Sequence, residues 1–590
     1  MLEYNIKVYS KIVIIVLFLN FLPSFTPAQK QEIVGYFSGG AAKNYKYNVR
    51  NIESSGSGGK LTVIDYAFCK PVRGSDRKIV PAFGNSVLDY QQIYPAEYSI
   101  DGVKDESVQA VRGNINQLKK LKARHPGLKI LISIGGWGGC TYFSDAALTK
   151  ESREFFVDSC INMYIKGNFP VVNGAGGYGA AAGIFDGIDI DWEFPISGGL
   201  PDMHTNPKDN DNLTELFKLF RKKLDEINPR LLLTAALPAQ EFNTKNFNVH
   251  QDSKYLTWIT LMTYDMYGGF DNNTVTGHHT NLFSPSDEPP IHPAQLSLDK
   301  TVKLFHDKYG VAYNKLLGGA AFYGRGWGEV DSVNNGLYRP GNSKVGGYDL
   351  YRYLVNLKNE GFKLYWDKSA LANWLYNPEK KIFWSFDTPQ SIALKTLYCK
   401  AHHMRGMMFW EISGDDDNGT LINSIYNMSM TGNPVDKLNS SKEQSSFSII
   451  KPTEGDYYIE GSDVVINSIV NTPNSSIVKI EFFVDNKPIG FAVGGSFDWA
   501  WFNASRGEHM IKATAEDVWG GVSESVPIKI YVQSTDKCSR LWQSGKTYNV
   551  EEQVIYNGKI FVCTKMHRYS YGANSPGSGT EYWKPLQGVD

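Results

Sequence analysis

Three carboxyl side chains stand at alternate positions of one short segment, Asp186–Pro195, which reads DGIDIDWEFP. In a β-strand alternate residues share a face, so Asp189, Asp191 and Glu193 project one way and the apolar residues between them project the other. Burying three carboxylates as charges is costly, and structural cores do not normally carry them. The pattern therefore indicates a reactive site rather than a solvated polar strand.

Carboxyl groups held this close cannot all ionise, so at least one of them keeps its proton at neutral pH. Glu193 is the last of the three, and a raised pKa would make it a general acid near neutral pH. Asp191 is placed to share that proton and to face a developing positive charge, while Asp189 tunes Asp191 from below. General acid catalysis is the expected chemistry.

Eight short apolar runs, separated by longer amphipathic segments, indicate which elements position these carboxyls. Segments such as Val108–Arg124 and Leu213–Ile227 have helical periodicity. Strand and helix alternating eight times predict an α/β protein with a parallel (β/α)8 TIM barrel, whose active site lies at the C-terminal ends of the strands, where Glu193 falls. The expected strands are 33–37, 61–68, 129–134, 184–192, 231–237, 258–264, 316–322 and 406–412.

The acidic segment resembles the DxxDxDxE signature of the family 18 glycoside hydrolases, the chitinase family, at all four acidic positions. Further motifs of that family follow in order along residues 32–430. Ser133–Trp137 is similar to its SxGG motif, Met262–Asp265 to MxYD, Phe322–Arg325 to the end of strand seven, and Trp410–Glu411 to strand eight. Phe270 departs from the pattern, because many relatives have Trp there, and this concerns one outer subsite.

In this family the substrate supplies the nucleophile. The resemblance implies that Glu193 protonates the glycosidic oxygen, that the 2-acetamido carbonyl attacks the anomeric carbon, and that Asp191 stabilises the resulting oxazolinium ion. Tyr264 would donate to the acetamido oxygen, and Asp189 completes the catalytic set. The residues expected to seat the substrate are Tyr36, Phe68, Gly135, Gly136, Trp137, Gly138, Phe194, Met262, Thr263, Asp265, Tyr323, Arg325 and Trp410.

Three functions fit this resemblance. The first is a secreted chitinase that hydrolyses β-1,4-linked N-acetylglucosamine polymers with retention at the anomeric carbon. The second is an endo-β-N-acetylglucosaminidase acting on other glycans, and the third is a non-catalytic chitin-binding lectin. Lectins of this scaffold typically lose the acid, so the presence of Glu193 disfavours the third. Chitin is favoured over other glycans by Trp410, by a subdomain expected as an insertion at about 327–390, and by the C-terminal segment, which resembles chitin-binding modules.

The rest of the chain divides around a catalytic domain at 29–432. An α+β subdomain is expected as an insertion at about 327–390, and the Ser-rich stretch 433–446 is typical of a linker. Short regular strands over 447–533 predict an immunoglobulin-like β-sandwich, interpreted as a spacer. Within the last module, 534–590, the segment Tyr548–Leu586 resembles the small β-rich chitin-binding modules of carbohydrate-binding families 5 and 12, but it has Met566–Tyr569 where relatives often have paired Trp. The aromatic residues expected to form its binding face are Trp542, Tyr548, Tyr569, Tyr571 and Trp583.

The first 28 residues have the pattern of a cleaved secretory signal peptide. A weakly basic start is followed by the short apolar run Ile12–Phe21 and by small residues at Thr26–Ala28. The mature protein is then expected outside the cell, without a membrane anchor. Buried free thiols are expected at Cys69, Cys140, Cys160 and Cys399, whereas Cys538 and Cys563 lie close enough in sequence for a disulfide that an exported protein would permit.

The charge balance restricts the partners. The 590 residues contain 60 Lys+Arg and 61 Asp+Glu, for a net charge of −1, which argues against a nucleic-acid-binding protein. Gly174–Gly179 matches GxGxxG but precedes a strand, so it does not predict a dinucleotide site. Neither Asp415–Gly419 nor His278–His279 has the spacing of a metal site. We therefore expect a monomer that binds chitin or chitooligosaccharides and needs no metal or cofactor.

Overall fold

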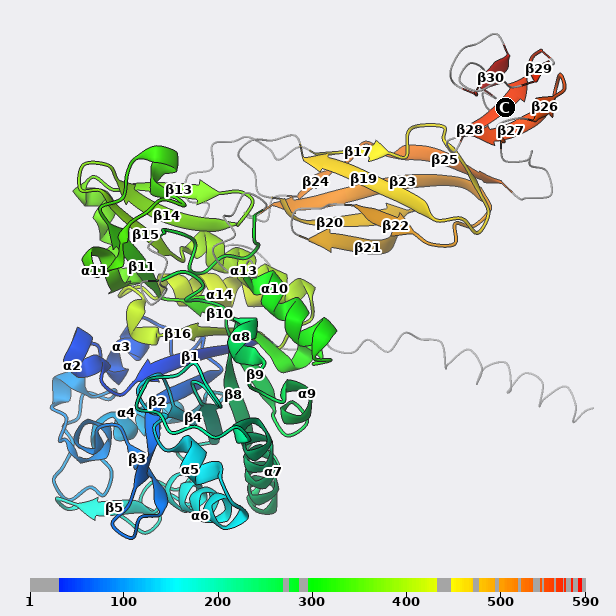
Figure 1. Cartoon of the computed structure of the whole chain (residues 1–590). Coiled ribbons are helices and arrows are strands. Elements are labelled where there is room, and N and C mark those ends of the chain that lie inside the picture. The colour runs from blue at the N-terminus through cyan, green and yellow to red at the C-terminus, as the bar shows by residue number, and fades with distance from the viewer. Residues whose placement is uncertain are drawn as a thin grey trace, which may run out of the picture.

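The structure is a computed structural model that describes residues 31–268, 275–285, 296–431, 447–470, 477–493, 498–517 and 522–533, with short segments between 542 and 585. Its largest unit is a closed barrel of eight parallel strands (Figure 1). Closure occurs where the first strand pairs with both the second and the last. The strands are β1 (Glu32–Ser38), β2 (Val63–Arg73), β4 (Lys129–Gly135), β7 (Gly187–Asp191), β8 (Leu232–Pro238), β9 (Trp258–Met262), β10 (Leu316–Ala321) and β16 (Gly406–Trp410). The predicted fold class is confirmed.

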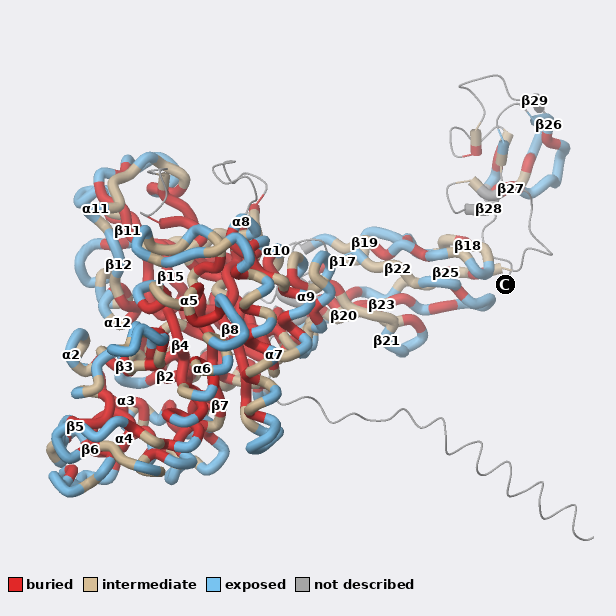
Figure 2. Tube along the Cα trace, turned by 60° about the horizontal axis from the view of Figure 1, so that its bottom comes forward, coloured by how far each residue is buried: buried red, intermediate tan, exposed pale blue. Residues whose placement is uncertain are grey.

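Helices cover the outside of the barrel, and two of them begin at a threonine cap. Thr149 accepts a hydrogen bond from the Ser152 amide at the start of α6 (Lys150–Cys160), and Thr388 caps α13 (Pro389–Ala401), which has Pro at its first position. The helices α4, α7, α10 and α14 span Gly113–Arg124, Asp209–Ile227, Leu298–Lys303 and Thr420–Thr431. Figure 2 shows the barrel strands as a largely buried trace and the exposed positions on the outer elements.

The inner face of the barrel changes character along its axis. Residues paired across parallel strands point to the same side, so register determines which side chains meet inside. One group is apolar and forms a continuous cluster that includes Val34, Val63, Leu131, Leu232, Trp258, Leu317 and Met408. Two positions further toward the C-terminal ends of the strands, the residues that face the interior are polar, and they include Asp65, Ser133, Asp189 and Thr234. A polar core of this kind needs internal partners for its groups.

An antiparallel sheet is inserted between the last two barrel strands. Its order is β12 (Gly347–Leu350), β11 (Tyr323–Gly328), β15 (Ile382–Phe386), β14 (Ala372–Asn377) and β13 (Lys363–Asp367). The sheet begins at Tyr323 rather than near residue 327, because only one residue separates it from β10. Beside its return to the barrel, Asp387 and Lys395 form a fully buried ion pair of 2.7 Å.

Two β-rich units follow the barrel (Figure 1). Residues 447–533 form a sandwich of two sheets, one with β17 (Phe447–Lys451), β19 (Val464–Val470) and β22 (Trp499–Trp501), the other with β18 (Tyr457–Ile459), β20 (Ile477–Val484), β21 (Lys487–Val493), β23 (Gly507–Asp517), β24 (Val522–Glu524) and β25 (Ile528–Gln533). The last unit has β26 (Thr547–Tyr548), β27 (Gln553–Tyr556), β28 (Lys559–Cys563), β29 (His567–Arg568) and β30 (Trp583–Pro585).

Some sequence predictions fall on residues that are not described. The signal peptide and the linker 433–446 lie there, as do Phe270 and Cys538, so the proposed bridge to Cys563 stays a prediction. Across the described ranges no helix combines the length and the apolar character needed to cross a membrane. The expectation of buried free thiols is confirmed for Cys69, Cys140, Cys160 and Cys399.

Candidate active site

The three carboxyls of the acidic segment form a column inside the barrel, rising toward the C-terminal ends of the strands. Asp189 is fully buried and accepts hydrogen bonds from three hydroxyls, those of Tyr36 (2.9 Å), Ser133 (2.7 Å) and Thr234 (2.6 Å). Asp191 is 4% exposed, and its Oδ1 has no hydrogen-bond partner in the described part of the chain. The three hydroxyl donors make Asp189 the carboxyl best able to carry charge.

Burial and mutual repulsion raise the pKa values of the column. Burial, and then the negative charge of Asp265, raise the pKa of Glu193 to about 8. Burial raises the pKa of Asp191 well above its usual range, and the charges of Glu193 and Asp189 add to this effect. Glu193 is therefore mostly protonated at neutral pH, as a general acid must be.

A charged pair stands beside the acid. Both side-chain oxygens of Asp265 accept from Arg325, at 2.7 Å from Nε and 2.8 Å from Nη2. Burial alone would raise the pKa of Asp265, but Arg325 and His279 outweigh it and hold the pKa well below its usual range. The Nδ1 of buried His279 lies 3.7 Å from Asp265 Oδ1, and its ring packs against Tyr323 with centroids 5.2 Å apart. Asp265 is thus an anion that opposes ionisation of Glu193.

Aromatic rings form the floor at this end of the barrel. Phe68 and Trp410 stack with centroids 5.4 Å apart and an interplanar angle of 13°, and both are partly exposed. Tyr36 lies beneath them, 5.8 Å from Trp410, with only 2% exposure. Trp137 is 51% exposed and contacts Phe194 edge-on at 6.4 Å. Flat apolar faces next to a general acid suit a sugar ring.

Two glycines let the loop after β4 approach both the floor and the acidic strand. Gly136 has φ +77°, and a Cβ added there would lie 2.4 Å from the Phe68 ring. At Gly135, with φ +122°, a Cβ would lie 2.0 Å from the Asp191 carbonyl oxygen. Gly136 also donates its amide to that oxygen at 2.9 Å. Side chains at these positions would separate the loop from β7.

Comparison with known proteins agrees with this geometry. A sequence profile described as "Glycosyl hydrolases family 18" matches residues 32–415, which contain the whole column and its aromatic floor. The chain belongs to glycosyl hydrolase family 18. A second profile, "Bacterial Ig domain", matches residues 446–534, the sandwich. The chain therefore combines a family 18 glycosyl hydrolase domain with an immunoglobulin-like domain.

Individual relatives agree with the family assignment. The chain is 33% identical over 443 residues to "Chitinase A1" from Niallia circulans, covering 69% of this chain and 60% of that protein. The chain thus spans about three fifths of that curated relative. Among solved structures, the catalytic domain of psychrophilic chitinase B from Arthrobacter TAD20 is similar with a TM-score of 0.63 and 32% identity, covering 69% of this chain and 97% of that one. A family 18 N-acetylglucosaminidase from Paenibacillus barengoltzii has a TM-score of 0.51 and 30% identity, covering 67% and 99%.

Most of the residues expected in the family 18 site come together, but Thr263 makes a structural contact instead. Tyr264 is 8% exposed and packs edge-on against Tyr323 at 5.9 Å, close to the column. Thr263 is fully buried, and its hydroxyl both donates to the Gly319 carbonyl and accepts from the Gly319 amide, at 2.8 Å each. Thr263 therefore joins β9 to β10 instead of facing the floor. Met262 is partly exposed and packs against the apolar cluster inside the barrel, and no atom lies within 4 Å of a Cβ built at Gly138.

Sequence reasoning missed two members of this site. Asp65 on β2 is fully buried inside the barrel beside Tyr36, and neither of its side-chain oxygens has a hydrogen-bond partner among the described residues. Burial and the charge of Asp189 raise its pKa well above the usual range. An acid within an apolar strand was a usable signal for Asp65. His279, the second, is brought to Asp265 only by the fold, and nothing in its local sequence indicates that partner.

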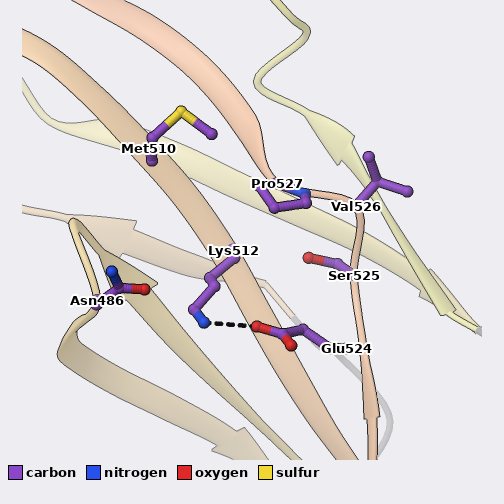
Figure 3. A pocket seen from close by; sticks show the side chains of 7 residues that line it. All are labelled: Asn486, Met510, Lys512, Glu524, Ser525, Val526 and Pro527. Carbon is purple, nitrogen blue, oxygen red and sulfur yellow. Dashed lines mark ion pairs between the residues drawn. The ribbon is translucent and has the colours of Figure 1, made fainter.

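The sandwich has a pocket of its own, away from the barrel site. Figure 3 shows a shallow pocket on the sandwich, lined by Asn486, Met510, Lys512, Glu524, Ser525, Val526 and Pro527. Its two charged groups, Lys512 and Glu524, pair with each other, and none of its lining residues is aromatic. This pocket therefore offers no aromatic face for sugar stacking, and the role of the sandwich as a spacer stays a prediction.

The expected binding face of the terminal unit needs correction. Tyr548 and Trp583 are 4% and 1% exposed and pack edge-on with centroids 5.2 Å apart, so they form the core of this small unit. A unit of this size has few other residues with which to build a core. Trp542 is partly exposed and contacts Tyr556 at 5.0 Å. Tyr569 and Tyr571 lie outside the described residues.

Proposed function

We propose that this protein is a chitinase that hydrolyses β-1,4-linked N-acetylglucosamine polymers by substrate-assisted catalysis with retention. One observation carries the proposal: a carboxyl with a raised pKa, Glu193, stands at the top of the carboxyl column and interacts electrostatically with Asp191, whose Oδ1 has no hydrogen-bond partner among the described residues. That pair supplies the proton and the acetamido partner that this reaction needs. The aromatic floor of Phe68 and Trp410 supplies a surface for the sugar.

The first step of the proposed reaction cleaves the glycosidic bond. Glu193 gives its proton to the glycosidic oxygen, and the leaving sugar departs as an alcohol. The carbonyl oxygen of the 2-acetamido group bonds to the anomeric carbon from the opposite face and forms an oxazolinium ion. Asp191 accepts a hydrogen bond from the acetamido N–H and stabilises the positive charge. Tyr264 donates to the acetamido oxygen and aligns it for attack.

The second step restores the enzyme. The Glu193 carboxylate takes a proton from water, whose oxygen bonds to the anomeric carbon while the oxazolinium ring opens. Two inversions at that carbon give net retention. The three hydroxyls that donate to Asp189 favour its charged form below Asp191, against the burial that raises its pKa.

Product analysis on chitin oligomers tests this function. Wild-type protein should release β-anomers first, as followed by NMR or by anomer-resolving chromatography within the first turnovers. Glu193→Gln keeps the shape of the acid but removes its proton, and it should lose at least about 10²-fold in kcat. A fully deacetylated polymer should not be cut. Release of α-anomers, or equal cleavage of the deacetylated polymer, would refute the mechanism.

An activity on other N-acetylglucosamine glycans is the second candidate, since the chain is also similar to the family 18 N-acetylglucosaminidase. The same assay separates the two. A chitinase should cut an internal bond of a chitin hexamer, whereas faster hydrolysis of a glycoprotein-type glycan or of a single terminal sugar would favour the second function. Binding of oligomers without turnover, with Glu193 intact, would favour a lectin.

We further propose that the protein is secreted as a monomer and that its terminal unit holds it on chitin. Because Tyr548 and Trp583 are buried, the binding face would use Trp542 with Tyr569 and Tyr571. Replacing these three by Ala in the full chain should lower retention on insoluble chitin while leaving hydrolysis of soluble oligomers unchanged. A matched change on the sandwich, Phe502→Ala, where the side chain is 62% exposed, should leave retention unaltered.

A further inference from the structure

The buried thiol of Cys140 lies at the junction between the loop after β4 and the end of the acidic strand. Its sulfur accepts a hydrogen bond from the Glu193 backbone amide at 3.2 Å. It also lies within donor range of two carbonyl oxygens, that of Gly136 at 3.2 Å and that of Asp191 at 3.3 Å. Cys140 is 3% exposed. One side chain thus contacts the backbone on both sides of Trp192, at the two residues that carry the reacting carboxyls.

These contacts occur where the sheet no longer holds the chain. The pairing of β7 with β4 ends at Asp191, and that with β8 ends at Ile190, so Glu193 lies beyond both ladders. The sulfur of Cys140 is the acceptor for the Glu193 amide. A buried amide without an acceptor costs about 1–3 kcal/mol, so this contact contributes to the local backbone conformation.

The protonation state of the thiol suits this task. Burial raises the pKa of Cys140 well above that of an exposed thiol, and the nearby charges of Glu193 and Asp191 act in the same direction. A neutral thiol has one proton to donate to a carbonyl oxygen and keeps sulfur lone pairs to accept from the amide. Both kinds of contact are therefore satisfied together.

The surrounding loop has no freedom to take over the role of the sulfur. A Cβ at Gly139 would lie 2.0 Å from the Gly135 carbonyl oxygen, and one at Gly135 would lie equally close to the Asp191 carbonyl oxygen. The backbone of the loop is therefore already in close contact with itself and with β7. Removal of the sulfur should leave an unpaired amide and a small void rather than a repacked loop.

The geometry points to Cys140 as a positioning residue for the general acid: its sulfur fixes the Glu193 peptide, and through it the carboxyl, relative to the floor of the site. This inference rests on the proposed function, because it assigns the acid to Glu193. It concerns placement of the acid rather than substrate binding. A loss of placement should therefore reduce kcat more than it changes KM.

Two substitutions and a matched control test this role. Cys140→Ala removes the hydrogen bonds, and we expect kcat on a chitin oligomer to fall about tenfold with KM within about twofold, because misplacement of a reacting group by about 1 Å can cost up to 10²-fold. Cys140→Ser retains a donor and an acceptor, and it should recover kcat to within about threefold of wild type. Cys160→Ala makes the same change at another fully buried thiol, in α6, and should lower Tm without lowering kcat.

A second readout does not depend on turnover. Hydrogen exchange at the Glu193 amide, resolved by mass spectrometry with residue-level fragmentation, should be faster in Cys140→Ala than in wild type, restored in Cys140→Ser and unchanged in Cys160→Ala. If wild-type protein cleaves no oligomer, the proposed function fails while the exchange pattern still reports on the contact. If wild type is active, the two ideas are judged separately.

Several outcomes would overturn the inference. Wild-type kcat in Cys140→Ala is one, and a loss no greater than that in Cys160→Ala is another. A Cys140→Ser variant as slow as Cys140→Ala would show that the volume of sulfur, not its hydrogen bonds, matters. If Cys140→Ala does not fold, the serine variant decides: kcat within about threefold supports the role, and a loss of tenfold or more contradicts it.

Discussion

Asp265→Asn should move the alkaline limit of activity to lower pH. Glu193 acts in its protonated form, so kcat/KM is fully present below the pKa of this group and is lost as pH rises through it. That pKa is raised to about 8, first by burial and then by the negative charge of Asp265. An amide at position 265 keeps the shape of the side chain and removes the charge. Glu193 should then release its proton more easily.

The expected size of the shift follows from the order of the two causes. A charge within about 4–6 Å changes a pKa by roughly 1–3 units, and burial is the larger cause here, so we expect about one unit. Arg325 contributes in the same direction, since the variant leaves its guanidinium without the two carboxylate contacts at 2.7 and 2.8 Å. The alkaline limb should move from near the wild-type value of about 8 to about 7, equivalent to about 1.4 kcal/mol.

The assay measures kcat/KM for a soluble chitin oligomer between pH 5 and about 9.5, a range that includes the alkaline limbs of wild type and variant. Asp331→Asn is the matched control, because Asp331 also pairs with both Nε and Nη2 of an arginine, Arg339, but is solvent-exposed. The control should leave the limb in place. An unchanged limb in Asp265→Asn, or a shift to higher pH, would refute the assignment of charge to Asp265 and of the proton to Glu193.

Three further changes probe the barrel. Gly136→Ala should displace the Phe68 ring, which lies 2.4 Å from the added Cβ, and lower kcat/KM about tenfold in oligomer assays. Asp65→Asn should raise Tm at pH 7, because the raised pKa of this acid makes its burial less favourable as pH increases; the gain should vanish near pH 4 in calorimetry. Lys395→Met breaks a fully buried ion pair and should cost about 3–5 kcal/mol in urea unfolding, whereas Lys380→Met, in an exposed pair, should cost less than about 1 kcal/mol.

The sequence predicted correctly those residues of the site whose positions depend on the periodicity of a single strand. Alternation within a single strand was enough to place Asp189 and Asp191 inside the barrel, since a strand has a period of two residues. The eight strands followed from eight apolar runs, because strands of a parallel barrel are buried on both faces. The start of the inserted sheet at Tyr323 could not be predicted in this way, because β10 continues into that sheet with almost no interruption. No turn residue marks the point where the barrel strand ends.

Contacts between distant segments were not predictable in this way. Asp265 meets Arg325 across 60 positions, and the register of β1 against β2 places Tyr36 beside Asp65. In the terminal unit a core residue was wrongly predicted to lie on the binding face. Trp583 was interpreted as a surface residue because aromatic residues bind sugars, but a small unit needs such a residue for its own core.

The carboxyl column also explains why the barrel tolerates so many acids. Burial raises the pKa of all four acids, but among them only Asp189 has three hydroxyl donors that lower its pKa in turn, so charge is best stabilised there. In the proposed reaction Glu193 loses its proton as a cation forms beside Asp191. The new negative charge would be unfavourable in the resting column, but it is compensated at that moment by the cation. Stabilisation that exists only in the transition state raises kcat rather than binding. Tyr36 was expected to seat the substrate, but it is 2% exposed and donates to Asp189, so it should change the rate through the column.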